Sequence, residues 1–227
     1  MFLTTLLQTT SAVTENNSNS LDLSFFDLAI KGGIIMIPLL ILLIIAVYII
    51  IERFVTLRRA SQEDREFMNK IKDYVFEGKI DSALNLCKQT DTPSARMVEK
   101  GISRLGRPMS DVLVAIENVG NLEVGKLENG LGFLATIAGG APMIGFFGTV
   151  IGMVQAFSEV ASNGNTIALD QLAGGIYTAM VTTVAGLLVG IIAFFGYNYL
   201  VIRVDKIMHI LETRNVEFLD MLNEPAN

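Results

Sequence analysis

Cysteine and histidine are almost absent from this chain of 227 residues, which contains one of each. A single cysteine cannot build a disulfide framework, and we interpret Cys87 as a small residue of a helical core. His209 lies in an amphipathic stretch and is interpreted as a surface or packing residue. The sequence contains no set of nucleophile, base and metal ligands, so we expect no metal site and no enzyme.

Formal charge is missing from three long segments. Residues 32–51, 129–158 and 171–202 contain 20, 30 and 32 positions without Asp, Glu, Lys, Arg or His. About 20 apolar residues cross a ~30 Å hydrocarbon layer as a helix, so each segment can span a membrane once. Transporters that move protons or charged solutes normally carry an ionisable group at membrane depth. We therefore do not expect this chain to be a complete transporter by itself.

Lysine and arginine are absent from residues 1–30 and from the connection 159–170. Of the 17 in the chain, 13 lie in residues 53–130 and three in residues 203–227. Because positive charge is retained on the cytoplasmic side, we expect the N-terminus outside and the middle domain and tail inside. The first residues lack the basic region of a signal peptide, so no cleaved signal is expected. The net charge of −6 argues against a nucleic-acid partner.

These patterns predict an all-α integral membrane protein with three transmembrane helices and long cytoplasmic helical extensions. The predicted segments are an outer N-terminal segment with an amphipathic helix (1–31), transmembrane helix 1 (32–52), a cytoplasmic helical domain (53–130), transmembrane helix 2 (131–158), an outer loop (159–171), transmembrane helix 3 (172–202) and a cytoplasmic C-terminal helix (203–227). In the cytoplasmic domain we expect helices over 61–76, 80–89 and 95–105. A fourth begins after Pro108, and its continuation into the second span is left open. One helix is expected from about 171 to about 222, its inner half amphipathic and packed on the cytoplasmic domain.

Small residues recur on one face of the second span and on one face of the third. They are Ala141, Gly145, Gly148, Gly152 and Ala156 in the second span, and Thr178, Thr182, Gly186 and Gly190 in the third. In lipid, packing replaces the hydrophobic effect as the source of helix association, and small residues let backbones approach closely. The first span is bulky on every side. We therefore expect a packed hairpin of the second and third spans, with the first span outside it, facing lipid.

Hydroxyl side chains lie on or beside these faces, at Thr149, Thr178, Thr182 and Thr183. A threonine in a membrane helix most often donates its hydroxyl proton to the carbonyl one turn back. Alternatively, the clustered hydroxyls line a polar path in which another subunit supplies the acid. The sequence alone leaves both interpretations open.

Two motifs are similar to the paired signatures of the MotA/TolQ/ExbB proton-channel family. They are APMIGFFGTVIGM at 141–153 and GIYTAMVTTVAGL at 175–187, the latter followed by Tyr197 and Asn198. The first span, with Gly32-Gly33, Pro38 and Glu52-Arg53, also resembles this family, and the likeness covers residues 25–205. Three spans with an outer N-terminus resemble ExbB and TolQ, whereas flagellar stator subunits of the MotA type have four.

The resemblance implies a pentameric ring whose second and third helices line a central pore. The pore would hold the single transmembrane helices of two copies of an ExbD- or TolR-like partner. A partner aspartate would take up protons from the periplasm, and its protonation cycle would turn ring and partner relative to each other. The threonines matching Thr149 and Thr183 would face that aspartate, with Thr178 and Thr182 also on the ion pathway. Protons, or alternatively sodium ions, would be the coupling ion, and no cofactor is implied.

The resemblance further implies a location in the inner membrane of a Gram-negative bacterium. An ExbB-like ring would energise TonB-dependent outer-membrane transport through a TonB-like protein. The alternatives are a TolQ-like subunit acting on a TolA-like protein in the Tol-Pal system, or a membrane scaffold that packs by the same faces and conducts nothing. Many ExbB and TolQ members have Glu at the position of Thr178 and Pro at that of Ile192. The missing Glu puts a ring carboxylate in doubt here, but flagellar-type relatives work with the acid on the partner alone.

The charge pattern predicts which cysteines an external reagent can reach. Asn165→Cys should react with an impermeant thiol reagent added outside, and Cys87 should react only after the membrane is opened. Labelling of intact and permeabilised cells measures both. The reverse pattern would overturn the predicted orientation.

Overall fold

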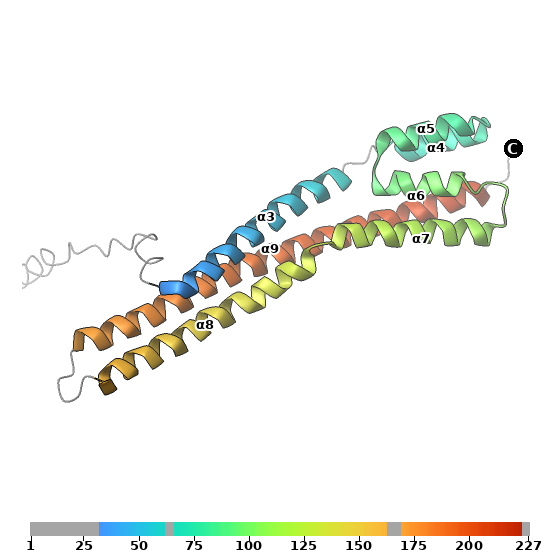
Figure 1. Cartoon of the computed structure of the whole chain (residues 1–227). Helices are drawn as coiled ribbons and strands as arrows, with labels where there is room; N and C mark the ends of the chain where they lie inside the picture. Colours follow the sequence, from blue (N-terminus) through green and yellow to red (C-terminus); the bar gives the residue numbers. More distant parts are fainter. Residues whose placement is uncertain (1–31, 62–65, 163–168, 224–227) are drawn as a thin grey trace, which may run out of the picture. The chain divides into compact units, whose positions relative to one another are not determined.

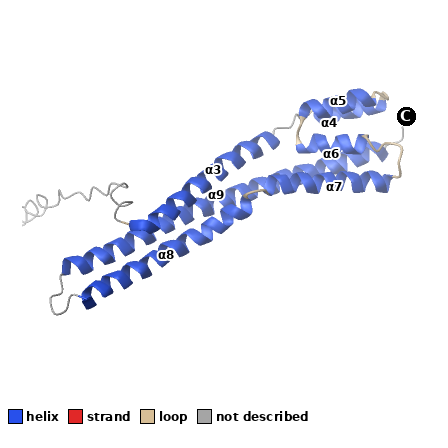
Figure 2. Cartoon of the chain, viewed as in Figure 1, coloured by secondary structure: helices blue, strands red, loops and turns tan. Residues whose placement is uncertain are grey.

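The structure is a computed structural model that describes residues 32–61, 66–162 and 169–223. Within these ranges every regular element is a helix (Figure 2). The chain divides into two compact units, which are described separately. One comprises Gly145–Ala185 and the chain up to Pro38, and the other comprises Leu39–Ile144 and Gly186–Asn227.

Three stretches of helix are long and apolar enough to cross a membrane: Gly33–Ala60, Met109–Ser162 and Leu172–Asn223. They contain the short turn η1 (Gly33–Ile35) followed by α3 (Met36–Ala60), then α8 (Leu131–Ser162), and α9 (Leu169–Asn223), all of which can be followed in Figure 1. The predicted all-helical fold with three spans is confirmed. The predicted amphipathic helix within 1–31 lies outside the described residues, as do residues 163–168 of the expected loop 159–171. The remaining positions of that loop are helical, because α8 continues to Ser162 and α9 begins at Leu169.

Helix α9 runs for 55 residues without interruption. At ~1.5 Å per residue it is roughly 80 Å long, against ~30 Å of hydrocarbon. Its later part has a buried stripe at helical spacing, formed by Val204, Ile207, Leu211, Phe218 and Met221. Phe218 lies so close to Gly101 of α6 (Pro93–Ile102) that a side-chain carbon at Gly101 would have no room. The single long helix, with its later part packed on the middle domain between the first and second spans, is confirmed.

The described part of the middle domain, between the first and second spans, contains four helices that pack in chain order. They are α4 (Phe67–Phe76), α5 (Ile80–Thr90), α6 and α7 (Met109–Glu128), with contacts between each successive pair. The start expected at Ser61 was wrong, because α3 continues to Ala60 and α4 begins at Phe67. Arg58 and Arg59 lie in the last turn of α3, where their positive charge stabilises the negative end of the helix dipole. The third helix ends at Ile102, three residues earlier than expected.

A break separates α7 from the second span. Helix α7 ends at Glu128, and Gly130 has φ of 80°, which glycine adopts without strain. The last carbonyls of a helix lack an intrahelical donor, and here Arg53 of α3 donates its Nη1 proton to Lys126 O at 2.9 Å. The fourth helix therefore does not continue into the second span, and an arginine at the end of the first span caps it.

The first span has a close protein neighbour, contrary to the sequence-based expectation. Leu39, Ala46 and Leu57 of α3 are buried, and Ile50 packs directly against Gly196 of α9. The glycine that allows this approach belongs to α9, which is why the bulky sequence of α3 gave no sign of it. The other faces of α3 remain apolar and exposed, as a lipid-facing helix requires; they carry Ile37, Leu40, Ile41, Ile44, Tyr48 and Ile51.

Cys87 lies in the core of the middle domain, with only 1% of its surface exposed. Burial, helped by the nearby charge of Glu99, raises the pKa of its thiol to about 12. The thiolate is the form that reacts, so the folded protein protects this residue from alkylation. The interpretation of Cys87 as a core residue is confirmed, but its use as an inner-side reporter is not.

We therefore expect Cys87 to stay unlabelled in permeabilised cells at neutral pH and to react only after unfolding. In a Cys87→Ala background, Lys88→Cys should label as soon as the membrane is opened, because residue 88 is exposed on the same helix. Mass spectrometry of the labelled protein with and without denaturant measures both. Rapid labelling of Cys87 in the folded protein would contradict the packing of α5.

Candidate functional site

The two hairpin helices approach each other backbone to backbone in the Gly145–Ala185 unit. A Cβ atom at Gly148 would lie 2.5 Å from Thr182 Oγ1, and one at Gly152 would lie 2.9 Å from Ala179 Cβ. On α9, a Cβ atom at Gly175 would lie 2.7 Å from Ala156 Cβ. Such distances are far inside van der Waals contact, so no larger residue fits at these glycines without moving a helix. Gly175 is a member of this contact that the sequence analysis did not single out.

The same kind of contact occurs within the other unit. Ala141 and Gly190 are buried, and a Cβ atom at Gly190 would lie 2.5 Å from Pro142 Cγ and 3.1 Å from Ala138 O. Pro142 has no N–H, so the carbonyl of Ala138 lacks its usual helical donor. Gly186 is also buried. Gly190 thus lets α9 lie against the proline and the carbonyl that the proline leaves free.

Two of the four predicted hydroxyls converge on one backbone carbonyl of α8. Thr182 is 1% exposed and donates its hydroxyl proton to Ala179 O at 2.7 Å, with Gly145 O 3.4 Å away. Thr183 is half-buried and donates across the interface to Gly145 O at 3.2 Å. Thr182 therefore follows the ordinary one-turn pattern, whereas Thr183 ties α9 to α8.

Thr149 and Thr178 lie at the edges of this contact, and both are half-buried. The Thr149 hydroxyl donates to Phe146 O of its own helix at 2.6 Å. It is one of two polar residues, with Ser158, along an open hollow on α8 that is otherwise lined by Val150, Met153, Val154 and Phe157. A hydroxyl that gives its proton to a carbonyl keeps lone pairs that can accept a hydrogen bond. Thr149 and Thr183 can thus receive a proton donor from outside the chain.

The model of the MotA/TolQ/ExbB proton channel family matches residues 89–213, which include both motifs and all four threonines. That match covers more than half of the chain. The chain belongs to the MotA/TolQ/ExbB proton channel family. It is therefore a membrane protein of a proton channel family, and its three apolar helices are the spans of such a protein.

Several named relatives of this family member align over most of its length. It is 31% identical to the Tol-Pal system protein TolQ of Haemophilus influenzae, over 90% of this chain and 96% of that protein. It is 30% identical to a biopolymer transport protein ExbB homolog of Methanothermobacter thermautotrophicus, over 77% of this chain. The alignment covers 62% of that protein, which is less than two thirds of its length. It is 26% identical to the biopolymer transport protein ExbB of Neisseria meningitidis, over 73% of this chain and 80% of that protein.

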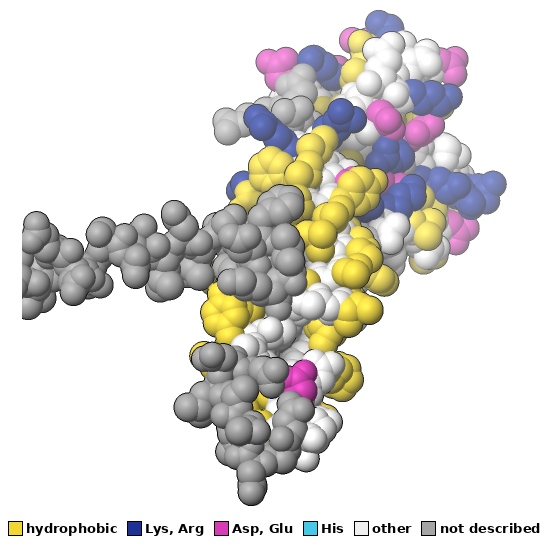
Figure 3. Space-filling model, turned by 60° about the vertical axis from the view of Figure 1, so that its left-hand side comes forward, with side chains coloured by type: hydrophobic (Ala, Val, Ile, Leu, Met, Phe, Trp, Pro, Cys, Tyr) yellow, Lys and Arg dark blue, Asp and Glu magenta, His cyan; other side chains and the backbone are white. Residues whose placement is uncertain are grey.

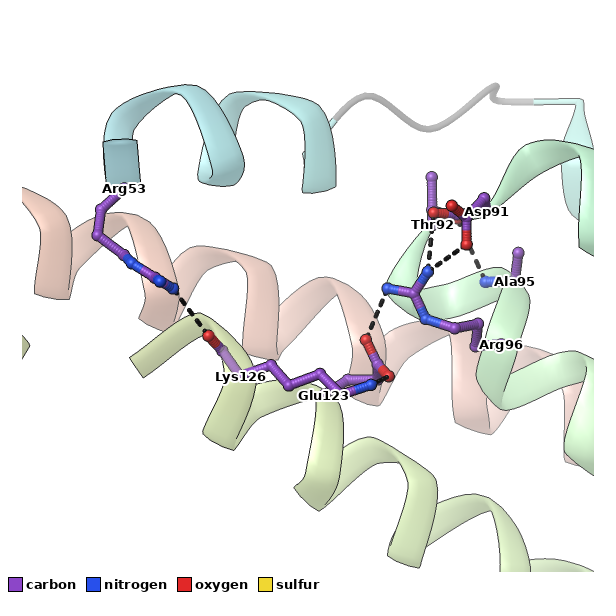
Figure 4. Close-up of polar contacts among 7 residues, drawn as sticks. All are labelled: Arg53, Asp91, Thr92, Ala95, Arg96, Glu123 and Lys126. Carbon is purple, nitrogen blue, oxygen red and sulfur yellow. Dashed lines mark hydrogen bonds and ion pairs between the residues drawn. The ribbon is translucent and has the colours of Figure 1, made fainter. Parts of the chain in front are cut away.

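An ion-pair cluster lies outside the spans of this proton channel family member, on α6 and α7 (Figure 4). The Glu123 side chain is 5% exposed; its Oε2 lies 2.6 Å from Arg96 Nη2 and its Oε1 lies 2.7 Å from Lys126 Nζ. Burial alone would raise the pKa of the Glu123 carboxyl, but the two cations outweigh this effect and lower it. Sequence reasoning missed this cluster. The sequence signal that could have revealed it is the position of Glu123, which shares the buried face of α7 with Gly120 and Leu127.

The close contact predicts different outcomes for two adjacent glycines. Gly175→Leu should destabilise the helix pair by at least the roughly 1–3 kcal/mol typical of overpacking, since Ala156 occupies the required space. Gly148→Leu should behave alike, because Thr182 occupies the required space, and should disrupt the homo-oligomer that is proposed below. Gly174→Leu is the matched control, because nothing lies within 4 Å of a Cβ atom there, and Ile44→Leu on the exposed face of α3 should be silent.

Thermal unfolding in detergent and native mass spectrometry of the purified protein measure these effects. Equal melting temperatures for the Gly174 and Gly175 variants, or intact oligomers from Gly148→Leu, would contradict the packing described.

Proposed function

We propose that this chain forms the homo-pentameric ring of an ion-driven motor in the inner membrane of a Gram-negative bacterium. In this proposal an ExbB-like ring uses the proton motive force, with an ExbD-like partner, to energise TonB-dependent outer-membrane transport. The observation that carries it is a pair of packed spans with hydroxyls bound to backbone carbonyls and no Asp, Glu, Lys, Arg or His between residues 171 and 202 or 129 and 158.

The hydroxyl geometry supports a mechanism in which the ring supplies hydrogen-bond acceptors and the partner supplies the acid. Thr149 and Thr183 each donate to a carbonyl, so their oxygens are available as acceptors. An acceptor in an apolar setting favours the protonated form of an approaching carboxylic acid, which can donate, over the carboxylate, which cannot. The proton-carrying group would then be an aspartate in the single span of an ExbD- or TolR-like partner. Thr178 and Thr182 would lie beside this path.

The orientation and pathway of the motor are part of the same proposal. The Lys and Arg distribution supports a periplasmic N-terminus and a cytoplasmic C-terminus. Relatives named ExbB support the TonB-linked role, and the long alignment with a protein named TolQ supports a Tol-Pal role as the second candidate. A neighbouring gene for a short protein with one span and an Asp within it would favour either motor over a non-conducting scaffold.

The proposal predicts that ion flux needs two components. In proteoliposomes with an imposed pH gradient, this chain alone should give no acid-dependent flux, because hydroxyls can orient a proton but cannot hold the charge. Adding the single-span partner should create the flux, and changing the partner's membrane Asp to Asn should abolish it. A robust flux from the ring alone would refute the assigned roles, and no flux with the partner would favour the scaffold.

Removal of the hydroxyls should impair coupling without preventing assembly. Thr149→Val and Thr183→Val together should lower partner-dependent flux roughly 10- to 100-fold, the range expected for losing a hydrogen bond of about 1.5–3 kcal/mol. Thr136→Val is the matched control, since its hydroxyl is exposed on α8 and donates to Gly132 O in the same way as Thr149 to Phe146 O. Thr178→Ala should have a smaller effect. Full flux in the double variant would contradict the proposal.

A further inference from the structure

A groove with a volume of about 320 Å³ lies between α3 and α9 in the unit that contains Leu39–Ile144 and Gly186–Asn227. Its walls divide into an apolar set and a cationic set. The apolar set includes Phe54, Leu57 and Leu200, and the cationic set is Arg58, Arg203 and Lys206. The groove is thus amphipathic and strongly positive at one end.

The groove lies where two spans reach the aqueous boundary. Arg203 is the first charged residue after the uncharged segment 171–202, and Arg58 lies one turn beyond Phe54 in the helix that leaves the uncharged segment 32–51. Phe54 and Leu57 precede Arg58 in α3, and Leu200 precedes Arg203 and Lys206 in α9; Ile207, which follows Lys206, is the one apolar lining residue beyond the cations. The groove therefore changes from apolar to cationic in the direction in which the spans leave the hydrocarbon.

Arg203 is held in place by aromatic neighbours. Its Nε and Nη2 donate to the Tyr199 hydroxyl at 3.0 and 2.7 Å, and its guanidinium lies 5.2 Å from the centre of the Tyr199 ring. That ring stacks on Phe54, with 6.1 Å between centroids. Nη1 takes no part in these bonds. A guanidinium fixed in this way is suited to a phosphate, and within 32–61, 66–162 and 169–223 no carboxylate forms an ion pair with Arg58, Arg203 or Lys206.

We propose that this groove is a binding site for an anionic phospholipid. The headgroup phosphate would contact Arg58, Arg203 and Lys206, and an acyl chain would lie along Phe54, Leu57 and Leu200. Basic pockets between membrane helices recognise lipid phosphates in this way. The apolar half of the lining favours a lipid over a free phosphate, which gains nothing from it. A zwitterionic lipid would bring its ammonium group toward three cations and should bind less well.

The test is a titration of the full-length oligomer, in neutral detergent, with phosphatidylglycerol or phosphatidylcholine, read by native mass spectrometry. Phosphatidylglycerol should bind more tightly. Arg58→Gln with Lys206→Gln should weaken its binding roughly 30-fold, about fivefold for each cation removed. Arg58 and Lys206 were chosen because neither side chain holds another described residue in place, whereas Arg203 contacts Tyr199. Arg203→Lys keeps the positive charge but loses the forked guanidinium, so it should weaken binding less than Arg203→Gln.

The matched control is Arg59→Gln with Lys88→Gln. It removes the same charge from exposed positions outside the groove, one of them adjacent to Arg58. This variant should bind phosphatidylglycerol like the wild type. Equal losses in the two double variants, or equal binding of the two lipids, would overturn the proposal. So would binding of glycerol phosphate alone with the affinity of the lipid, which would identify a soluble phosphate as the occupant.

Discussion

The backbones of α8 and α9 touch where Gly148, Gly152 and Gly175 leave no room for a side chain, and the candidate site depends on this contact. In lipid, the association of two helices comes from packing and hydrogen bonds, because lipid tails are as apolar as the side chains they would replace. Close approach also brings a backbone carbonyl of one helix within reach of a hydroxyl on the other. Thr183 uses it by donating to Gly145 O at 3.2 Å.

The hydroxyl arrangement explains how a chain without an acid in its spans can belong to a proton channel family. Thr149, Thr182 and Thr183 each direct the hydroxyl proton to a carbonyl. The oxygens of the half-buried Thr149 and Thr183 keep lone pairs that can accept a hydrogen bond, whereas Thr182 is 1% exposed. In the proposed motor, the donor to these oxygens would come from another molecule.

At the boundary of the spans, arginines have structural tasks beyond orientation. Arg53 caps the end of α7 through Lys126 O, and Lys126 in turn pairs with the buried Glu123 (Figure 4). Arg203 is held on Tyr199 beside a groove that we propose for a lipid phosphate. In Figure 3, hydrophobic side chains cover much of the described surface in view, and most of the charged side chains in view gather on another part of it.

The sequence by itself determined the number of spans, the long third helix and the small-residue faces, because uncharged length and residue spacing are local properties. It also determined the candidate hydroxyls through two motifs. Only the tertiary structure decided that Ile50 packs on Gly196 and that burial raises the pKa of the Cys87 thiol. It also decided that Thr183 donates to Gly145 O of the other helix, whereas Thr182 makes a one-turn bond to Ala179 O. Each of these depends on which residue of a distant helix lies opposite. The spacing within one helix carries no information about the register of its neighbour.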